Sequence, residues 1–162
     1  MKDEVKNELN SLINGYEERK TRQVKKIEVK KGEEDKFLQE FYLIRKKIIK
    51  LAMIEIGELL KSRGQNYQID EQDEMVDREA KTKDARISIY FLIPEKGYVS
   101  QLLKYPSVSF IADRREKKIW THENTIGPNR GGQSGGTGSY PLSQITTDLV
   151  HQKIMHVLKE LF

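Results

Sequence analysis

A glycine-rich stretch holds the residues of this sequence that most readily form a binding site. The candidate site residues are Arg130, Gly131, Gly132, Ser134, Gly135, Gly136 and Thr137. Backbone amides with no Cβ atom beside them can bind an anion when a helix begins a few residues later, and the arginine would add positive charge. The spacing matches no phosphate-binding fingerprint. A small-anion or nucleotide site is therefore one hypothesis, and a mobile linker is the other.

A Glu-x-Lys triplet, formed by Glu116 and Lys118, offers a second kind of chemistry. Metal-dependent nucleases of the restriction-enzyme type use such a triplet, in which carboxylates hold the metal ion and the lysine polarises the attacking water. Asp84 or Asp113 could supply a second carboxylate. Glu116 nevertheless falls in residues 113–117, a polar connection of hairpin length where charged side chains are expected to face water. A nuclease-like enzyme is therefore an alternative hypothesis and not the leading one.

Histidine and cysteine usage favours no other catalytic or metal site. His151 and His156 are five residues apart, a spacing that does not place them on one helix face for joint metal binding. His122 and Glu123 could form a general acid–base pair, but no nucleophile motif accompanies them. The absence of cysteine excludes disulfides, thiolate nucleophiles and cysteine-ligated zinc. We therefore expect no catalytic residues, no metal and no cofactor.

Clusters of basic residues raise the question of nucleic-acid binding. The candidate contacts are Lys25, Lys26, Lys30, Lys31, Arg114 and Arg115. Tyr67, Tyr90 and Trp120 could supply stacking faces for single-stranded nucleic acid. The formal net charge of +4 is too small to require such a partner, and an acidic run over residues 70–79 can itself attract the basic run over residues 20–31. Nucleic acid is therefore kept as one candidate partner, beside a protein.

The first 32 residues are expected to form a charged helical arm ahead of the domain. Apolar side chains recur at helical spacing in residues 3–18, at Val5, Leu9, Leu12, Ile13 and Tyr16. The Asn-Gly dipeptide at residues 14–15 interrupts this stripe, and residues 21–32 are predicted to be a basic connector. Because a helix so short and charged is unstable alone, we expect it to dock on its own domain, on a second copy or on a partner.

A long helix is predicted over residues 33–62, at the start of an α+β domain that spans residues 33–162. Acidic residues favour its start, and Gly64 stands where a left-handed residue can end a helix. The middle of this helix is apolar on two sides, and one sheet can cover only one of them. We therefore expect a homodimer in which Phe41, Ile48 and Met53 meet a second copy.

Four strands are predicted to follow, over residues 65–69, 85–93, 107–112 and 118–122, with a turn at residues 94–97. Residues 123–141 are predicted to be a long loop, since they hold six of the eleven glycines. A helix capped by Thr146 or Thr147 ends the chain. The predicted fold class is α+β with two layers, in which the long helix and the C-terminal helix cover a four-stranded, mainly antiparallel sheet.

These features indicate a class of function without naming a ligand. No run approaches the ~20 apolar residues of a membrane-spanning helix, and the N-terminus lacks a secretory signal. We therefore expect no membrane partner and a cytoplasmic location. The leading hypothesis is a non-enzymatic binding or assembly module that forms a homodimer and acts through the arm, the sheet and the glycine-rich loop.

Overall fold

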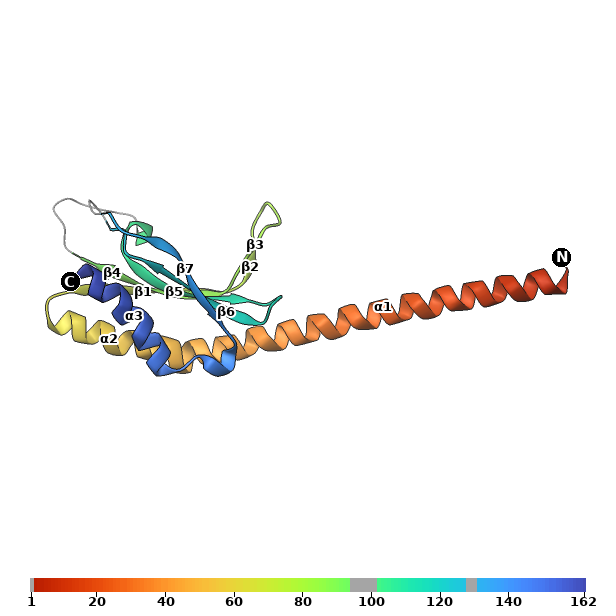
Figure 1. Cartoon of the computed structure of the whole chain (residues 1–162), viewed down its shortest axis with the longest axis horizontal. Coiled ribbons are helices and arrows are strands. Elements are labelled where there is room, and N and C mark those ends of the chain that lie inside the picture. Colours follow the sequence, from red (N-terminus) through yellow and green to blue (C-terminus); the bar gives the residue numbers. More distant parts are fainter. Residues whose placement is uncertain (1, 94–101, 128–130) are drawn as a thin grey trace. The chain divides into compact units, whose positions relative to one another are not determined.

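The computed structural model describes residues 2–93, 102–127 and 131–162 of the chain (Figure 1). The chain divides into two compact units, Met1–Lys36 and Phe37–Phe162. The first unit is helical, and the second contains the sheets, the core and the remaining helices. The predicted turn at residues 94–97 and the candidate Arg130 lie outside the described residues.

Helix α1 runs without interruption over Asp3–Ile44, and a π-helical segment, Arg45–Ile49, joins it to helix α2, Lys50–Ser62. The predicted break near Gly15 and the predicted connector over residues 21–32 are therefore wrong. A glycine inside a helix costs only about 1 kcal/mol, and this stretch contains no proline. The helix consequently continues through both Gly15 and Gly32. Its predicted end is confirmed, because Gly64 adopts a left-handed φ of 81°.

The main sheet has five strands in the order β1-β4-β5-β6-β7, and every neighbouring pair is antiparallel. The strands are β1 (Asn66–Gln72), β4 (Arg86–Leu92), β5 (Ser107–Asp113), β6 (Lys118–Asn124) and β7 (Ser134–Tyr140). A separate hairpin pairs β2 (Met75–Val76) with β3 (Thr82–Lys83), and short 3-10 turns occupy Leu102–Lys104 and Leu142–Gln144. The α+β class is confirmed, whereas the predicted four-stranded sheet lacks one strand.

Helix α3, Thr147–Leu161, ends the chain as the sequence predicts. Thr146 caps it, since its hydroxyl accepts a hydrogen bond from the Leu149 amide at 3.2 Å. Asp148 adds a negative charge in the first turn, where the helix dipole favours one. These local signals fix the start of the helix whose inner face meets the sheet.

Strand β7 occupies part of the sequence that was predicted to be a loop. Its glycines give no alternation of apolar and polar side chains, so the usual pattern of a strand is missing. Backbone pairing with β6 holds it instead, with Thr121 opposite Gly138 and His122 opposite Gly136. Thr137 is the extra residue of a bulge between these pairs. The predicted long loop is therefore wrong for this segment.

Helices α2 and α3 pack on the same face of the sheet and enclose the core (Figure 1). The fully buried side chains of this core include Phe41, Phe91, Phe110, Ile49, Met53 and Ile154. Ile48 is partly buried and packs against the same cluster. Helix α3 contacts α2 beside this core. Phe41 and Met53 are thus core residues of one chain, and their predicted contact with a second copy is wrong.

Arg45, the first residue of the π-helical segment, ties the helix to the end of β1. Its Nη1 donates to the Gln72 carbonyl at 3.1 Å, and its Nη2 donates to the Asp73 carboxylate. The guanidinium carbon lies 4.7 Å from the centroid of the Tyr42 ring, within the range of a cation–π interaction. The guanidinium therefore contributes hydrogen bonds, charge pairing and ring packing at a single point.

At Gly57, helix α2 lies close against strand β1. A Cβ atom added there would lie 2.4 Å from Cε2 of Tyr67 on β1. The Tyr67 hydroxyl donates to Glu58 Oε1 at 2.6 Å. This hydrogen bond, together with burial and the charge of Glu58 as smaller causes, raises the pKa of Tyr67 to about 12. The bond also holds the ring in place against the helix.

We predict that Gly57→Ala lowers the free energy of unfolding by about 1–3 kcal/mol, because overpacking outweighs the roughly 1 kcal/mol of helix propensity that alanine adds. Gly15→Ala is the matched control, since no heavy atom lies within 4 Å of a Cβ atom added there. It should raise the helix content of α1 without lowering stability. Urea denaturation followed by circular dichroism measures both. A Gly57→Ala protein as stable as the parent would contradict the packing described.

Candidate binding site between β6, β7 and α3

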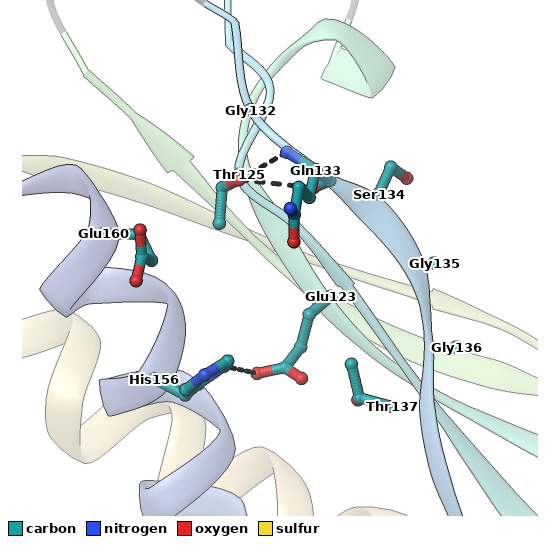
Figure 2. Close-up of a pocket in the computed structure, with 10 residues that line it drawn as sticks. All are labelled: Glu123, Thr125, Gly132, Gln133, Ser134, Gly135, Gly136, Thr137, His156 and Glu160. Carbon is teal, nitrogen blue, oxygen red and sulfur yellow. Dashed lines mark hydrogen bonds and ion pairs between the residues drawn. The ribbon is translucent and has the colours of Figure 1, made fainter.

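A cavity of about 470 Å³ lies between the β6–β7 hairpin and helix α3 (Figure 2). Its lining residues are Glu123, Thr125, Gly132, Gln133, Ser134, Gly135, Gly136, Thr137, His156 and Glu160. Strand β6 supplies Glu123, helix α3 supplies the last two, and the others come from the chain between them. A volume of this size is typical of pockets for small ligands and side chains. The cavity is therefore the candidate functional site.

Glu123 supplies a buried charge to this cavity. Its side chain is 6% exposed, whereas that of His156 is 71% exposed. Carboxylate Oε1 lies 2.8 Å from His156 Nδ1 (Figure 2). Alternation along β6 explains the burial, because Ile119, Thr121 and Glu123 point to the face that the helices cover. A carboxylate removed from water needs a partner, and the imidazole supplies one.

The cavity wall formed by the glycine-rich segment is mostly backbone. A Cβ atom at Gly132 would lie 2.6 Å from Thr125 Oγ1, so a side chain would prevent this close passage. The Thr125 amide donates to the Gln133 carbonyl at 2.8 Å, and the Gln133 amide donates to Thr125 Oγ1 at 2.8 Å. Lys153 of α3 donates to the Thr137 carbonyl at 2.9 Å. These bonds position the strand against the helix and keep its main chain at the cavity.

The structure brings together most of the residues predicted for an anion site. Gly132, Ser134, Gly135, Gly136 and Thr137 line the cavity, and Gly131 directly precedes them. The carboxylates of Glu123 and Glu160 line the same space. Two carboxylates create a negative potential that opposes an anion and attracts a cation. Because Arg130, the cation of the small-anion hypothesis, lies outside the described residues, that hypothesis stays a prediction.

The pairing of Glu123 with His156 joins two residues that the sequence does not connect. A pair of Glu123 with His122 was only one possibility from the sequence, and consecutive residues of a strand point to opposite faces. His122 Nε2 instead lies 3.4 Å from Ser134 Oγ, and His151 Nε2 lies 3.4 Å from a carboxylate oxygen of Glu55. One sequence signal could have found the site, namely a glutamate at an inward-facing position of an alternating strand.

The Glu-x-Lys triplet lies apart from this cavity, at the turn between β5 and β6. Glu116 and Lys118 are both exposed, and the Glu116 amide donates to Asp113 Oδ1 at 3.2 Å. Burial, and secondly the charge of Asp113, raise the pKa of Asp84, while Arg115 opposes the shift. Within the part of the chain that the structure describes, no group of three or more histidine or acidic side chains is placed to hold a metal ion. The nuclease hypothesis therefore gains no metal centre from these residues.

The basic residues considered for nucleic-acid binding are divided between the two units. Lys25, Lys26, Lys30 and Lys31 belong to α1, whereas Arg114 and Arg115 belong to the β5–β6 turn. Arg114 pairs with the carboxylate of Glu74. Of the three aromatic residues considered for stacking, Tyr90 is buried and the Tyr67 hydroxyl is bound to Glu58. Trp120, which is 40% exposed, is the remaining candidate. The candidate contacts thus belong to two separate units, and nucleic-acid binding through them stays a prediction.

Comparisons with known proteins find no match to this chain among protein-family models, curated proteins or solved structures. Over the described ranges, no helix is both long enough and apolar enough to cross a membrane. The geometry of the cavity is therefore the basis for any functional proposal.

Proposed function

We propose that the chain is a non-enzymatic binding module whose cavity receives a basic side chain from an extended peptide. The observation that carries this proposal is the buried Glu123 carboxylate, which faces a cavity and has an exposed histidine as its partner. A lysine or arginine that enters the cavity can form charge-assisted hydrogen bonds with this carboxylate. Glu160, four residues after His156 on the same helix, also lines this wall of the cavity.

Strand β7 offers the main chain of such a peptide a place to pair. It is the last strand of the sheet, and Ser134–Tyr140 contains neither proline nor a charged residue. Edge strands usually carry such residues, because they prevent pairing with other chains. The opposite edge, β1, carries Asp70 and Glu71. An extended peptide can therefore add to β7 through main-chain hydrogen bonds while one of its side chains enters the cavity.

The polar groups of the cavity support binding over catalysis. An imidazole that is oriented by a carboxylate can activate a hydroxyl when the imidazole and the hydroxyl lie within about 3 Å of each other. Ser134 Oγ lies near His122 rather than His156. Thr137 Oγ1 is 2.9 Å from Thr121 Oγ1, and Thr125 Oγ1 accepts a bond from the Gln133 amide. Each of these hydroxyls therefore has a partner other than the Glu123–His156 pair.

We predict that a short capped peptide of alternating valine and threonine with one central lysine binds the full chain, and that Glu123→Gln weakens this binding about tenfold or more. The substitution keeps the size of the side chain but removes the charge that the lysine meets. Isothermal titration calorimetry at low ionic strength measures both affinities. Glu116→Gln is the matched control, because Glu116 is exposed in a turn outside the cavity and its loss should leave the affinity unchanged.

The same peptide with norleucine in place of lysine separates the two parts of the interaction. Norleucine keeps the aliphatic chain but lacks the ammonium group, so pairing with β7 would remain while the contact with Glu123 is lost. The norleucine peptide should bind the parent protein more weakly than the lysine peptide does. The two peptides should bind the Glu123→Gln protein with equal affinity. Equal affinity of the two peptides for the parent protein would show that the carboxylate recognises no cation.

A further inference from the structure

The helical unit that precedes Phe37 presents an apolar stripe to water. At 3.6 residues per turn, its members fall within an arc of about 120°. They are Val5, Leu9, Leu12, Ile13, Tyr16, Val24 and Ile27, and each is between 45% and 67% exposed. Val29, which is 62% exposed, lies on the opposite side of the helix. Because helices draw most of their stability from packing of such a face, we expect another surface to cover this stripe.

The two halves of this unit carry opposite charge. Residues 2–18 contain five acidic and two basic side chains, whereas residues 19–31 contain seven basic and one acidic. Two copies aligned in the same direction would place the two basic segments against each other, which is unfavourable. Two copies in opposite directions would place each basic segment against the acidic segment of the other. Charge complementarity therefore selects an antiparallel pair of copies.

The spacing of the stripe also favours the antiparallel arrangement. When residue 18 of each copy lies at the crossing point, Leu9 stands opposite Ile27 and Leu12 stands opposite Val24, and each pair occurs twice. Tyr16 then stands opposite Lys20, an arrangement that suits a cation–π contact. Apolar residues thus meet on both sides of the crossing, as they do in coiled coils.

We propose that a second copy of this chain covers the stripe, through antiparallel pairing of residues 3–33 of the two α1 helices. This surface is independent of the cavity at Glu123, so failure of one proposal leaves the other unaffected. It also differs from the dimer contact expected from the sequence, since the structure buries Phe41 and Met53 of that contact in the core.

Val24→Ser, with Val29→Ser as its matched control, tests this surface. Sedimentation equilibrium of the full chain at micromolar concentration should give twice the 18.9 kDa chain mass. Because both copies lose a stripe residue, Val24→Ser should raise the dimer dissociation constant about tenfold or more. Val29→Ser makes the same change off the stripe and should leave that constant unchanged. A monomeric parent chain, or equal effects of the two substitutions, would overturn the proposal.

Disulfide formation tests the direction of the pair, because an introduced thiol has no competing cysteine among the described residues. Leu12→Cys chains and Val24→Cys chains are mixed and oxidised. An antiparallel pair gives mainly disulfides between the two kinds of chain. A predominance of disulfides between two Leu12→Cys chains would overturn the antiparallel arrangement. The dimer should also weaken as salt screens the attraction between the oppositely charged halves, and a dimer strengthened by salt would contradict the charge argument.

Discussion

Phe41→Ala is expected to lower the free energy of unfolding by about 3–5 kcal/mol. The Phe41 ring is fully buried among core residues of the helices and the sheet. Truncation removes its apolar contacts and leaves a cavity that packed neighbours can fill only in part. A loss of this size is a large share of the roughly 5–15 kcal/mol that stabilises a typical domain. Guanidinium denaturation of the full chain, followed by circular dichroism, measures it.

Phe162→Ala is the matched control, because it makes the same change at a side chain that is 68% exposed. Its cost should stay near or below about 0.5 kcal/mol, as for most surface substitutions. If the Phe41→Ala protein does not fold, Phe41→Leu keeps the measurement possible with a smaller loss of about 1–1.5 kcal/mol. Equal stability losses at Phe41 and Phe162 would show that Phe41 is not a core residue.

Arg45→Ala is expected to cost about 2–3 kcal/mol in the free energy of unfolding, through loss of charge-assisted hydrogen bonds and of packing on Tyr42. The Arg45 side chain is 12% exposed, so its bonds are shielded from water on the arginine side. Asp73 is largely exposed, and solvent screening therefore keeps the loss below that of a fully buried ion pair. Thermal and urea denaturation of the full chain give the value.

Arg45→Lys and Lys47→Ala separate the causes of this loss. Lysine keeps the charge, but a single ammonium group cannot reproduce the fork that reaches both the Gln72 carbonyl and Asp73, so Arg45→Lys should recover only part of the stability. Lys47 is exposed two residues further along the chain, and Lys47→Ala should have little effect. If Arg45→Ala matched Lys47→Ala, the proposed anchor between the helix and β1 would be refuted.

The three central strands and the last helix could be predicted from the sequence because their signals are local. Alternating side chains mark β4, β5 and β6, and Thr146 with Asp148 marks the start of α3. Strand β7 could not be predicted in this way. Its glycines lack the side chains that create a pattern, and its pairing with β6 is a tertiary contact made by the backbone.

The unbroken α1 helix and the Glu123–His156 pair escaped prediction for different reasons. Gly15 and Gly32 suggest breaks in the sequence, but each costs too little to stop a helix that proline does not interrupt. At the site, the sequence predicts a ligand site at the glycine-rich segment, whereas the proposed cation site also needs Glu123 and His156. These two residues are separated by 33 positions and meet only when α3 packs on the sheet. No spacing rule connects them.

The most direct test of the proposed binding site is a nuclear magnetic resonance titration of the full chain with the lysine peptide. The carboxyl carbon of Glu123, assigned by its absence from the Glu123→Gln spectrum, should shift as the peptide binds. The amide hydrogens of β7 that face away from β6 should exchange more slowly, because strand addition gives them new acceptors. If the peptide binds while the Glu123 signal and the β7 amides stay unchanged, the cavity is not the binding site.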